Sequence, residues 1–205
     1  MNNSKTNLAT PTPQIKLELL ALALDGCTRC VGTLDNIETA IKKVESVLKL
    51  TGTEIELNKI LIESEEEAKK HRLAISPTVR INDHDIILET LESECDSCND
   101  LCGCEEGTSC RVWKYQGEEY MEAPVGLIVE SLIAEIYGGN QETIRETEPY
   151  QEVPLNLKRF FASKAEKEAS EVSDCCSAEK QETCCESSEK QTCCQTEEAG
   201  TCGCQ

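Results

Sequence analysis

Apolar side chains that could form a core stop well before the end of this 205-residue chain. From residue 162 onward, apolar residues other than Cys and Ala nearly vanish. Such a segment cannot bury enough apolar surface to offset the entropy that its chain would lose on folding, so we expect it to be disordered. The folded part must therefore be built from the preceding residues, which suffice for one domain of ordinary size.

The first part of the chain shows a pattern of alternating strands and helices. Residues 15–24 are an apolar run typical of a buried central strand, and residues 53–62 alternate as in a second strand. Between them lies a predicted amphipathic helix that ends at Gly52. Its apolar residues recur at spacings of three and four, and they are Leu34, Ile37, Ile41, Val44 and Leu48.

The next part of the pattern predicts a short helix, two hairpins and a last helix. A capping box indicates a helix over residues 64–72. Residues 75–81 and 85–90 flank a turn sequence and are expected to pair as a hairpin, and a smaller hairpin is expected at Gly117. Pro124 suits the first turn of the last helix.

These elements define the predicted organisation of the chain. Within a charged linker, the apolar segment 153–161 either docks on the domain or a partner or forms only a transient helix. The ranges are 1–13 for a disordered lead, 14–139 for an α/β domain with a Cys-rich insert at 92–122, 140–174 for the linker and 175–205 for a disordered tail.

Charge and cysteine content restrict the classes of partner. The formal net charge of -19 repels phosphate backbones and anionic membrane surfaces, so we expect neither nucleic-acid binding nor membrane insertion. The chain also shows no apolar run of membrane-spanning length and no signal peptide, which predicts a cytoplasmic protein. In that compartment, 15 cysteines indicate metal binding or redox chemistry rather than structural disulfides.

The first two cysteines form the motif Cys27-Thr28-Arg29-Cys30, directly after the first strand and at the start of the first helix. Unpaired N–H groups and the positive end of the helix dipole stabilise a thiolate at that place, and Arg29 adds a cation. Cys27 is thus the predicted nucleophile, and Cys30 is placed to resolve a mixed disulfide. Zinc binding by the pair, or no chemistry at all, are the alternatives.

The order of elements and the motif together resemble the thioredoxin and glutaredoxin fold. Pro77, within Ser76-Pro77-Thr78, stands where that family has the cis-proline that faces the CxxC motif. The resemblance implies a βαβαββα fold over residues 14–139, with the Cys-rich insert before the last helix and the disordered Cys-rich tail after it. It also implies that the fourth strand returns to the end of the sheet where Cys27 lies, which would place the insert beside Cys27.

Several segments resemble, more narrowly, an uncharacterised thioredoxin-like family of bacteria and archaea, a domain of unknown function. The resemblance implies that some members are encoded near arsenic or heavy-metal resistance genes. The chain departs from thioredoxin itself in having Thr-Arg in place of Gly-Pro within the CxxC motif. The segments that carry the narrower resemblance are LDGCTRC, SPTVRIN, CNDLCGC, CRVWKYQGEEY and PVGLIVESLIAEIYGG.

The insert carries five cysteines at short spacings: Cys95, Cys98, Cys102, Cys104 and Cys110. Thiolates crowded in this way bind soft metals, with zinc as the first candidate and an iron–sulfur cluster as the second, and we expect no organic cofactor. Residues 81–110 hold nine acidic residues and no Lys or Arg, which favours a bound cation or protonated or oxidised thiols. The alternative is two structural disulfides that pin the loop. A tetrahedral metal site would leave one of the five thiols over, and this fifth thiol would pair with Cys27 or stay free.

The last eight cysteines, called the tail cysteines below, come as four pairs whose first members recur every nine residues. Nine residues at about 100° each would turn successive pairs to opposite sides of a helix. A flexible chain can instead gather three or four thiolates around one ion, which predicts a metallothionein-like sink or shuttle for Cu(I), Zn, Cd, Hg or As(III). The alternative is a drifted low-complexity repeat. The tail cysteines are Cys175, Cys176, Cys184, Cys185, Cys193, Cys194, Cys202 and Cys204.

The leading hypothesis is therefore a thioredoxin-like dithiol protein that binds, buffers or transfers soft metal or metalloid ions, with thiol–disulfide exchange at the CxxC motif as an added activity. One alternative is a general thiol–disulfide oxidoreductase with an incidental tail. The other is a pure metal-binding protein without redox activity. Beyond the ions themselves, the partners that fit are a protein dithiol donor or a metal transporter.

Overall fold

Four strands form the central sheet, in the spatial order β2-β1-β3-β4. The first, β1 (Gln14–Ala21), pairs parallel with β2 (Glu54–Leu61) and antiparallel with β3 (Thr78–Ile81), which pairs antiparallel with β4 (His84–Asp85). Every residue of β1 from Leu17 onward is buried, and before it only Gln14 and Lys16 are exposed or partly exposed. This burial confirms the predicted central strand. The computed structural model describes residues 13–104, 107–138 and 152–173.

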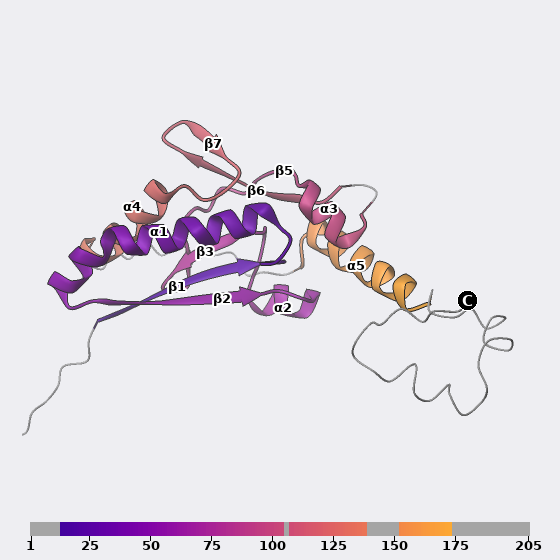
Figure 1. Cartoon of the computed structure of the whole chain (residues 1–205), viewed down its shortest axis with the longest axis horizontal. Coiled ribbons are helices and arrows are strands. Elements are labelled where there is room, and N and C mark those ends of the chain that lie inside the picture. The colour runs from indigo at the N-terminus through magenta and orange to yellow at the C-terminus, as the bar shows by residue number, and fades with distance from the viewer. Residues whose placement is uncertain (1–12, 105–106, 139–151, 174–205) are drawn as a thin grey trace, which may run out of the picture.

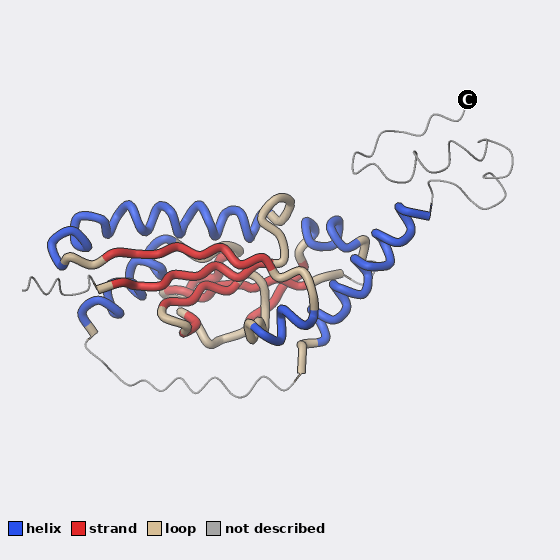
Figure 2. Tube along the Cα trace, turned by 90° about the horizontal axis from the view of Figure 1, so that it is seen from below, coloured by secondary structure: helices blue, strands red, loops and turns tan. Residues whose placement is uncertain are grey.

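Two helices pack with the sheet around one core. The long helix α1 (Thr28–Thr51) runs along one side of the sheet, as Figure 2 shows, and ends at Gly52, whose φ of 66° is left-handed. The later helix α4 (Val125–Tyr137) packs against α1. Leu17 and Leu19 of β1 point into this core, together with the buried apolar residues of both helices. The sequence predicted both helices, and both are confirmed.

The capping box and the first hairpin are also present. The hydroxyl of Ser64 accepts a hydrogen bond from the Glu67 backbone N–H at 3.2 Å and starts α2 (Glu65–Lys70). Asn82 and Asp83 make the turn between β3 and β4 with positive φ angles of 47° and 68°. The second hairpin strand is shorter than the predicted 85–90, because the carbonyl groups of residues 87 and 89 accept hydrogen bonds from Arg111 of the insert instead.

The insert folds as a second, antiparallel sheet with one short helix. Its strands β5 (Leu91–Glu94), β6 (Ser109–Tyr115) and β7 (Glu118–Tyr120) lie in that order, and α3 (Asp96–Cys102) connects the first two. The predicted hairpin at Gly117 is the β6–β7 turn. The sequence did not predict β5 or α3, which are too short to show a periodic apolar pattern.

After the domain, α5 (Leu155–Ser173) packs against α3 and α2, and Figure 1 shows it beside the insert. The expectation of disorder from residue 162 is wrong for residues 162–173, which continue this helix. They are rich in Ala, Lys and Glu, which favour helix, and the Lys167 ammonium donates to the carbonyl oxygens of Asp100 and Leu101 at 2.8 and 3.5 Å.

The predicted docking segment is the buried beginning of α5. Val153, Leu157, Phe160 and Phe161 join the core that contains the CxxC and insert cysteines. Asn156 lies within the first turn of α5, and its side-chain amide exchanges two hydrogen bonds with the backbone of Ser109 in β6, at 2.8 and 3.2 Å. The helix therefore fastens to the insert as well as to the core.

Other expectations concern residues that lie outside the described ranges. The tail cysteines, the lead up to residue 12 and the linker residues 139–151 are among them. Within the part of the chain that the structure describes, no helix has the length and apolar character needed to cross a membrane. The described architecture is thus a four-stranded mixed sheet with helices and a small antiparallel sheet.

Candidate metal centre

Four buried cysteine sulfurs meet where the insert touches the start of α1. Cys27, Cys95, Cys98 and Cys110 place their Sγ atoms within 4.8 Å of one another, and we call them the four-thiol cluster. The Sγ of Cys98 lies 3.6 Å from that of Cys27 and 3.1 Å from that of Cys110. All four are free thiols, and each is at most 3% exposed.

The starts of α1 and α3 and the strand β6 bring these sulfurs together. Cys27 ends the loop that follows β1 and is the N-cap of α1, in extended conformation, at the helix start that the sequence predicted. Cys95 is the N-cap of α3, and Cys98 lies one turn further, with its N–H donating to the Cys95 carbonyl at 3.0 Å. Cys110 is in β6. The expectation that the insert lies beside Cys27 is confirmed.

Arg29 fastens the insert to α1. Its guanidinium donates to the hydroxyl of Ser93 at 2.9 Å, to the carbonyl of Cys110 at 3.4 Å and to the carbonyl of Glu94. The sequence predicted a cation that stabilises the Cys27 thiolate. In the structure the same charge binds backbone carbonyls on both sides of the cysteine loop, that of Glu94 just before Cys95 and that of Cys110.

Pro77 follows a cis peptide bond, as the family resemblance implied. The carbonyl of Ser76, just before it, accepts a hydrogen bond from the backbone N–H of Arg111 at 2.8 Å. The residue after Cys110 is therefore paired with the segment that faces the CxxC motif. The insert covers this edge of the molecule, where the motif would otherwise meet solvent.

The second cysteine of the motif is buried but stands outside the four-thiol cluster. Cys30 is fully buried, and its Sγ lies 3.7 Å from the hydroxyl oxygen of Ser76. Its pKa is raised, above all by its hydrogen bond to the Cys27 sulfur and also by burial. It is a fifth thiol beside the cluster rather than one of its four members.

Two of the five insert cysteines, Cys102 and Cys104, form a disulfide and do not join the cluster. The sequence grouped all five insert cysteines as ligands and treated the CxxC pair separately. The structure takes three sulfurs from the insert and one from the CxxC motif. The predicted order of strands, which puts the insert beside Cys27, was the feature of the sequence that indicated a site shared by the insert and the CxxC motif.

The thiols of the cluster influence one another strongly. The pKa of Cys27 is lowered because its sulfur accepts hydrogen bonds from other thiols, first that of Cys110. The pKa of Cys95 is lowered to about 7, again chiefly through Cys110. The pKa of Cys110 is raised, mainly by its hydrogen bond to Cys27. For Cys98 the Cys110 thiol lowers the pKa, but Cys27, Cys95 and burial outweigh this and raise it.

Sequence reasoning missed one residue next to the cluster, Arg111. Its side chain is 1% exposed, and burial lowers its pKa to about 10, so it stays charged at neutral pH. It donates to the Glu89 carbonyl at 2.9 Å and to the Thr78 hydroxyl at 3.2 Å, and it lies over the Trp113 ring at 5.1 Å. It links the insert to the central sheet.

The sulfur positions fit a single tetrahedral ion. Zn–S bonds of about 2.3 Å in a tetrahedron place the sulfurs about 3.8 Å apart, and the cluster spans 3.1 to 4.8 Å. An iron–sulfur cluster has several irons and sulfides between its cysteines and needs a wider arrangement. The four thiols could therefore hold a mononuclear metal site.

Comparisons with known proteins give a family but no function. No curated protein matches the chain, and no solved structure matches it. Residues 14–132 match a family described as "Domain of unknown function (DUF2703)". The matched region covers more than half of the chain and includes the central sheet, the insert and all four cysteines of the cluster. The chain therefore belongs to this family, the DUF2703 domain of unknown function.

Proposed function

We propose that this protein binds one soft divalent metal ion, zinc as the first candidate, through Cys27, Cys95, Cys98 and Cys110. The observation that carries the proposal is the mutual approach of four buried sulfurs within 4.8 Å, from segments that the fold brings together. Four thiolate ligands complete the coordination of zinc and leave no open position, as in structural sites and in sites that store or hand over the ion. The proposed role is binding and transfer, not metal-assisted catalysis.

The electrostatics of the cluster support a cation. Cys27 and Cys95 have lowered pKa values and tend to be thiolates, whereas Cys98 and Cys110 hold their protons. A divalent ion can replace those protons and satisfy all four sulfurs at once. Trivalent arsenic takes three thiolates and would leave one sulfur of the cluster unused. A tetrahedral divalent ion is thus a better match to the described site than a metalloid.

The ion transfer that we propose would also use the tail cysteines. The tail cysteines would collect soft ions and bring them to the buried cluster, and a metal transporter or a protein dithiol would exchange ions with the tail. The overall scaffold that we propose is thioredoxin-like. Support comes from the strand order β2-β1-β3-β4, the CxxC motif between β1 and α1, and the cis-proline at Pro77.

Thiol–disulfide exchange at Cys27 and Cys30 is the second candidate function. The lowered pKa of Cys27 favours it, because the thiolate is the attacking species. Burial opposes it for protein substrates: both sulfurs are 0% exposed beneath the insert and α5. A disulfide of another protein can reach Cys27 only if the insert moves away. We therefore place metal binding first.

The test uses the full chain and a tail-serine chain in which all eight tail cysteines are replaced by Ser. Both are purified without air, and bound metal is measured by elemental analysis beside a count of free thiols. We expect one ion per tail-serine chain, and Co²⁺ in its place should give the visible spectrum of a tetrahedral thiolate site. A reduced, folded tail-serine chain that takes up no zinc or cobalt would refute the proposal.

A separate assay addresses the second candidate. Reduced tail-serine protein is mixed with a small aromatic disulfide, and the released thiol is followed by absorbance. Thiol release that falls in Cys27→Ser and stops at a mixed disulfide of Cys27 in Cys30→Ser, while Cys30→Ser still binds one ion per chain, would establish exchange at the CxxC motif beside metal binding. Equal rates of thiol release in Cys27→Ser and the parent would exclude the motif as the exchange site.

A further inference from the structure

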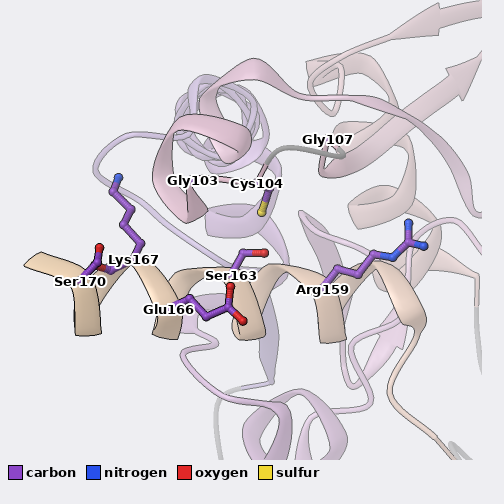
Figure 3. A pocket seen from close by; sticks show the side chains of 8 residues that line it. All are labelled: Gly103, Cys104, Gly107, Arg159, Ser163, Glu166, Lys167 and Ser170. Atoms are coloured by element: carbon purple, nitrogen blue, oxygen red, sulfur yellow. The ribbon is translucent and has the colours of Figure 1, made fainter.

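The Cys102–Cys104 disulfide lies at the C-terminal end of α3, where the insert meets α5, whereas Cys95 and Cys98 of the four-thiol cluster lie at the start of this helix. Cys102 is the last residue of α3, and Gly103 makes a left-handed turn with φ of 66°. A pocket of about 520 Å³ lies here, lined by Gly103 and Cys104 on the insert and by Ser163 and Lys167 on α5. Figure 3 shows the sulfur of Cys104 pointing toward α5.

The two sulfurs of this disulfide differ in access. Cys102 is fully buried, whereas Cys104 is only partly buried and lines the pocket. A thiol that enters the pocket therefore meets the Cys104 sulfur first. Attack on that sulfur would displace Cys102 as the leaving thiolate.

The structure also holds a hydrogen-bond donor at the leaving sulfur. The Thr108 hydroxyl lies 3.2 Å from the Sγ of Cys104 and 3.4 Å from the Sγ of Cys102, and Thr108 is 1% exposed. Its backbone N–H donates to the side-chain carbonyl of Asn99, which fixes its position. When Cys102 leaves, this hydroxyl can turn to it and stabilise the thiolate.

Lys167 removes an electrostatic obstacle to the same step. The C-terminal end of a helix carries partial negative charge, which disfavours a thiolate at Cys102. The Lys167 ammonium donates to the carbonyl oxygens of Asp100 and Leu101, the two residues before Cys102. Its positive charge therefore lies at the place where the leaving group becomes negative.

A purely structural role explains this disulfide poorly. It joins residues only two positions apart, and closing so short a loop restricts the unfolded chain little. The packing of α3 is already secured by buried apolar contacts with α5 and by the Lys167 hydrogen bonds. An exchangeable disulfide explains the short loop, the pocket at Cys104 and the donors at Thr108 and Lys167 together.

We propose that Cys102 and Cys104 are a reversible redox pair, distinct from the four-thiol cluster, and that they react with a low-molecular-weight thiol bound in the pocket between α3 and α5. The thiolate of the first small thiol attacks Cys104 Sγ, forms a mixed disulfide and releases Cys102, which takes up a proton. A second small thiol attacks the mixed disulfide and leaves as the oxidised dimer. Cys104 is then a thiol as well, so two electrons have passed from two small thiols to the protein.

The sequence allows this pair to be followed by itself in the full chain. Cleavage before Asp100 and after Glu105 releases residues 100–105, in which Cys102 and Cys104 are the only cysteines. Protein is incubated in mixtures of reduced and oxidised glutathione, alkylated and digested in this way. We expect the peptide to change from the disulfide to the doubly alkylated form as the share of reduced glutathione rises. A peptide that stays oxidised in excess reduced glutathione, in protein that is still folded, overturns the proposal.

Single variants test which sulfur is attacked. In Cys102→Ser, Cys104 remains at the pocket and should form a mixed disulfide with oxidised glutathione. In Cys104→Ser, the buried Cys102 should do so at least tenfold more slowly. Equal labelling of the two variants would show that the pocket does not direct the attack, and would contradict the proposal.

Replacing Thr108 gives a further test that leaves every cysteine in place. Thr108→Val should slow reduction of the peptide at least tenfold, and Thr108→Ser should restore the rate, with the bound metal per chain unchanged in both. Equal rates in Val and Ser variants would exclude the hydroxyl from the step. The tests are independent of metal binding, because reduction of Cys102–Cys104 should also proceed in Cys27→Ser, whose cluster lacks one ligand.

Discussion

The two cysteines of the CxxC motif should differ sharply in their contribution to metal binding. Both are fully buried and lie one helical turn apart, but only Cys27 belongs to the four-thiol cluster. A structural zinc site binds with about 10–16 kcal/mol in total, so one of four thiolates accounts for about 3 kcal/mol. At about 1.4 kcal/mol per tenfold change, Cys27→Ser should weaken zinc binding at least about 100-fold. Cys30→Ser should stay within about threefold of the parent.

The assay is a zinc competition titration in the tail-serine chain, so that the tail cysteines do not bind the ion. A chromophoric chelator of known affinity competes with the protein, and the circular dichroism of each variant shows that it is folded. Cys30 is the matched control for Cys27, because it has the same burial, the same helix and the same substitution.

The outcome separates two arrangements of the motif. Equal losses in both variants would mean that Cys30 is also a ligand and that the described cluster is not the ligand set. A larger loss in Cys30→Ser than in Cys27→Ser would refute the reasoning from the sulfur positions altogether. Loss in Cys27→Ser alone is what the geometry requires.

Three more predictions test how the cluster is held and charged. Arg29→Ala removes the bonds that fasten the insert to α1 and should speed alkylation of the cluster thiols in metal-free protein at least tenfold, whereas Lys43→Ala, an exposed change on the same helix, should not. Phe160→Ala should loosen α5, because emptying a buried aromatic site costs about 3–5 kcal/mol, and hydrogen exchange in α5 should rise. Leu155→Ala, at a position 63% exposed on the same helix, should leave exchange unchanged. Zinc binding should release about two protons at pH 8, from the two cluster thiols with raised pKa, and weaken as pH falls; calorimetry in buffers of different ionisation enthalpy measures this, and no release would contradict the assigned charges.

The periodic parts of the fold could be predicted from the sequence. The helix with Gly52 at its end and the hairpin at Asn82 and Asp83 follow from local spacing and turn chemistry, and both are present. The place of the insert beside Cys27 followed from the order of strands. Each of these depends on residues close in sequence or on simple topology.

The composition of the cluster and the reach of α5 could not be predicted. Spacing alone does not show which of five crowded cysteines turn toward Cys27, since α3 sends Cys98 to the cluster and Cys102 to the opposite end of one short helix. The helix beyond residue 161 has few apolar residues, and its order comes from docking of Phe160 and from Lys167 at the end of α3. Both features arise from tertiary contacts between distant segments.

If the cluster binds the proposed divalent ion, charge balance would account for the two arginines beside it. Four thiolates around a divalent ion carry a net charge of about -2, and such a charge is costly to bury unless other charges lie near it. Arg29 binds the carbonyl of Cys110, and Arg111 is the next residue in β6. The hydrogen bonds of both reach backbone carbonyls and hydroxyls of the insert and its neighbours, so both guanidinium groups lie close to segments that carry cluster cysteines. The same two side chains thus fasten the insert beside the CxxC motif, and with the proposed ion bound they would offset part of the negative charge of the site.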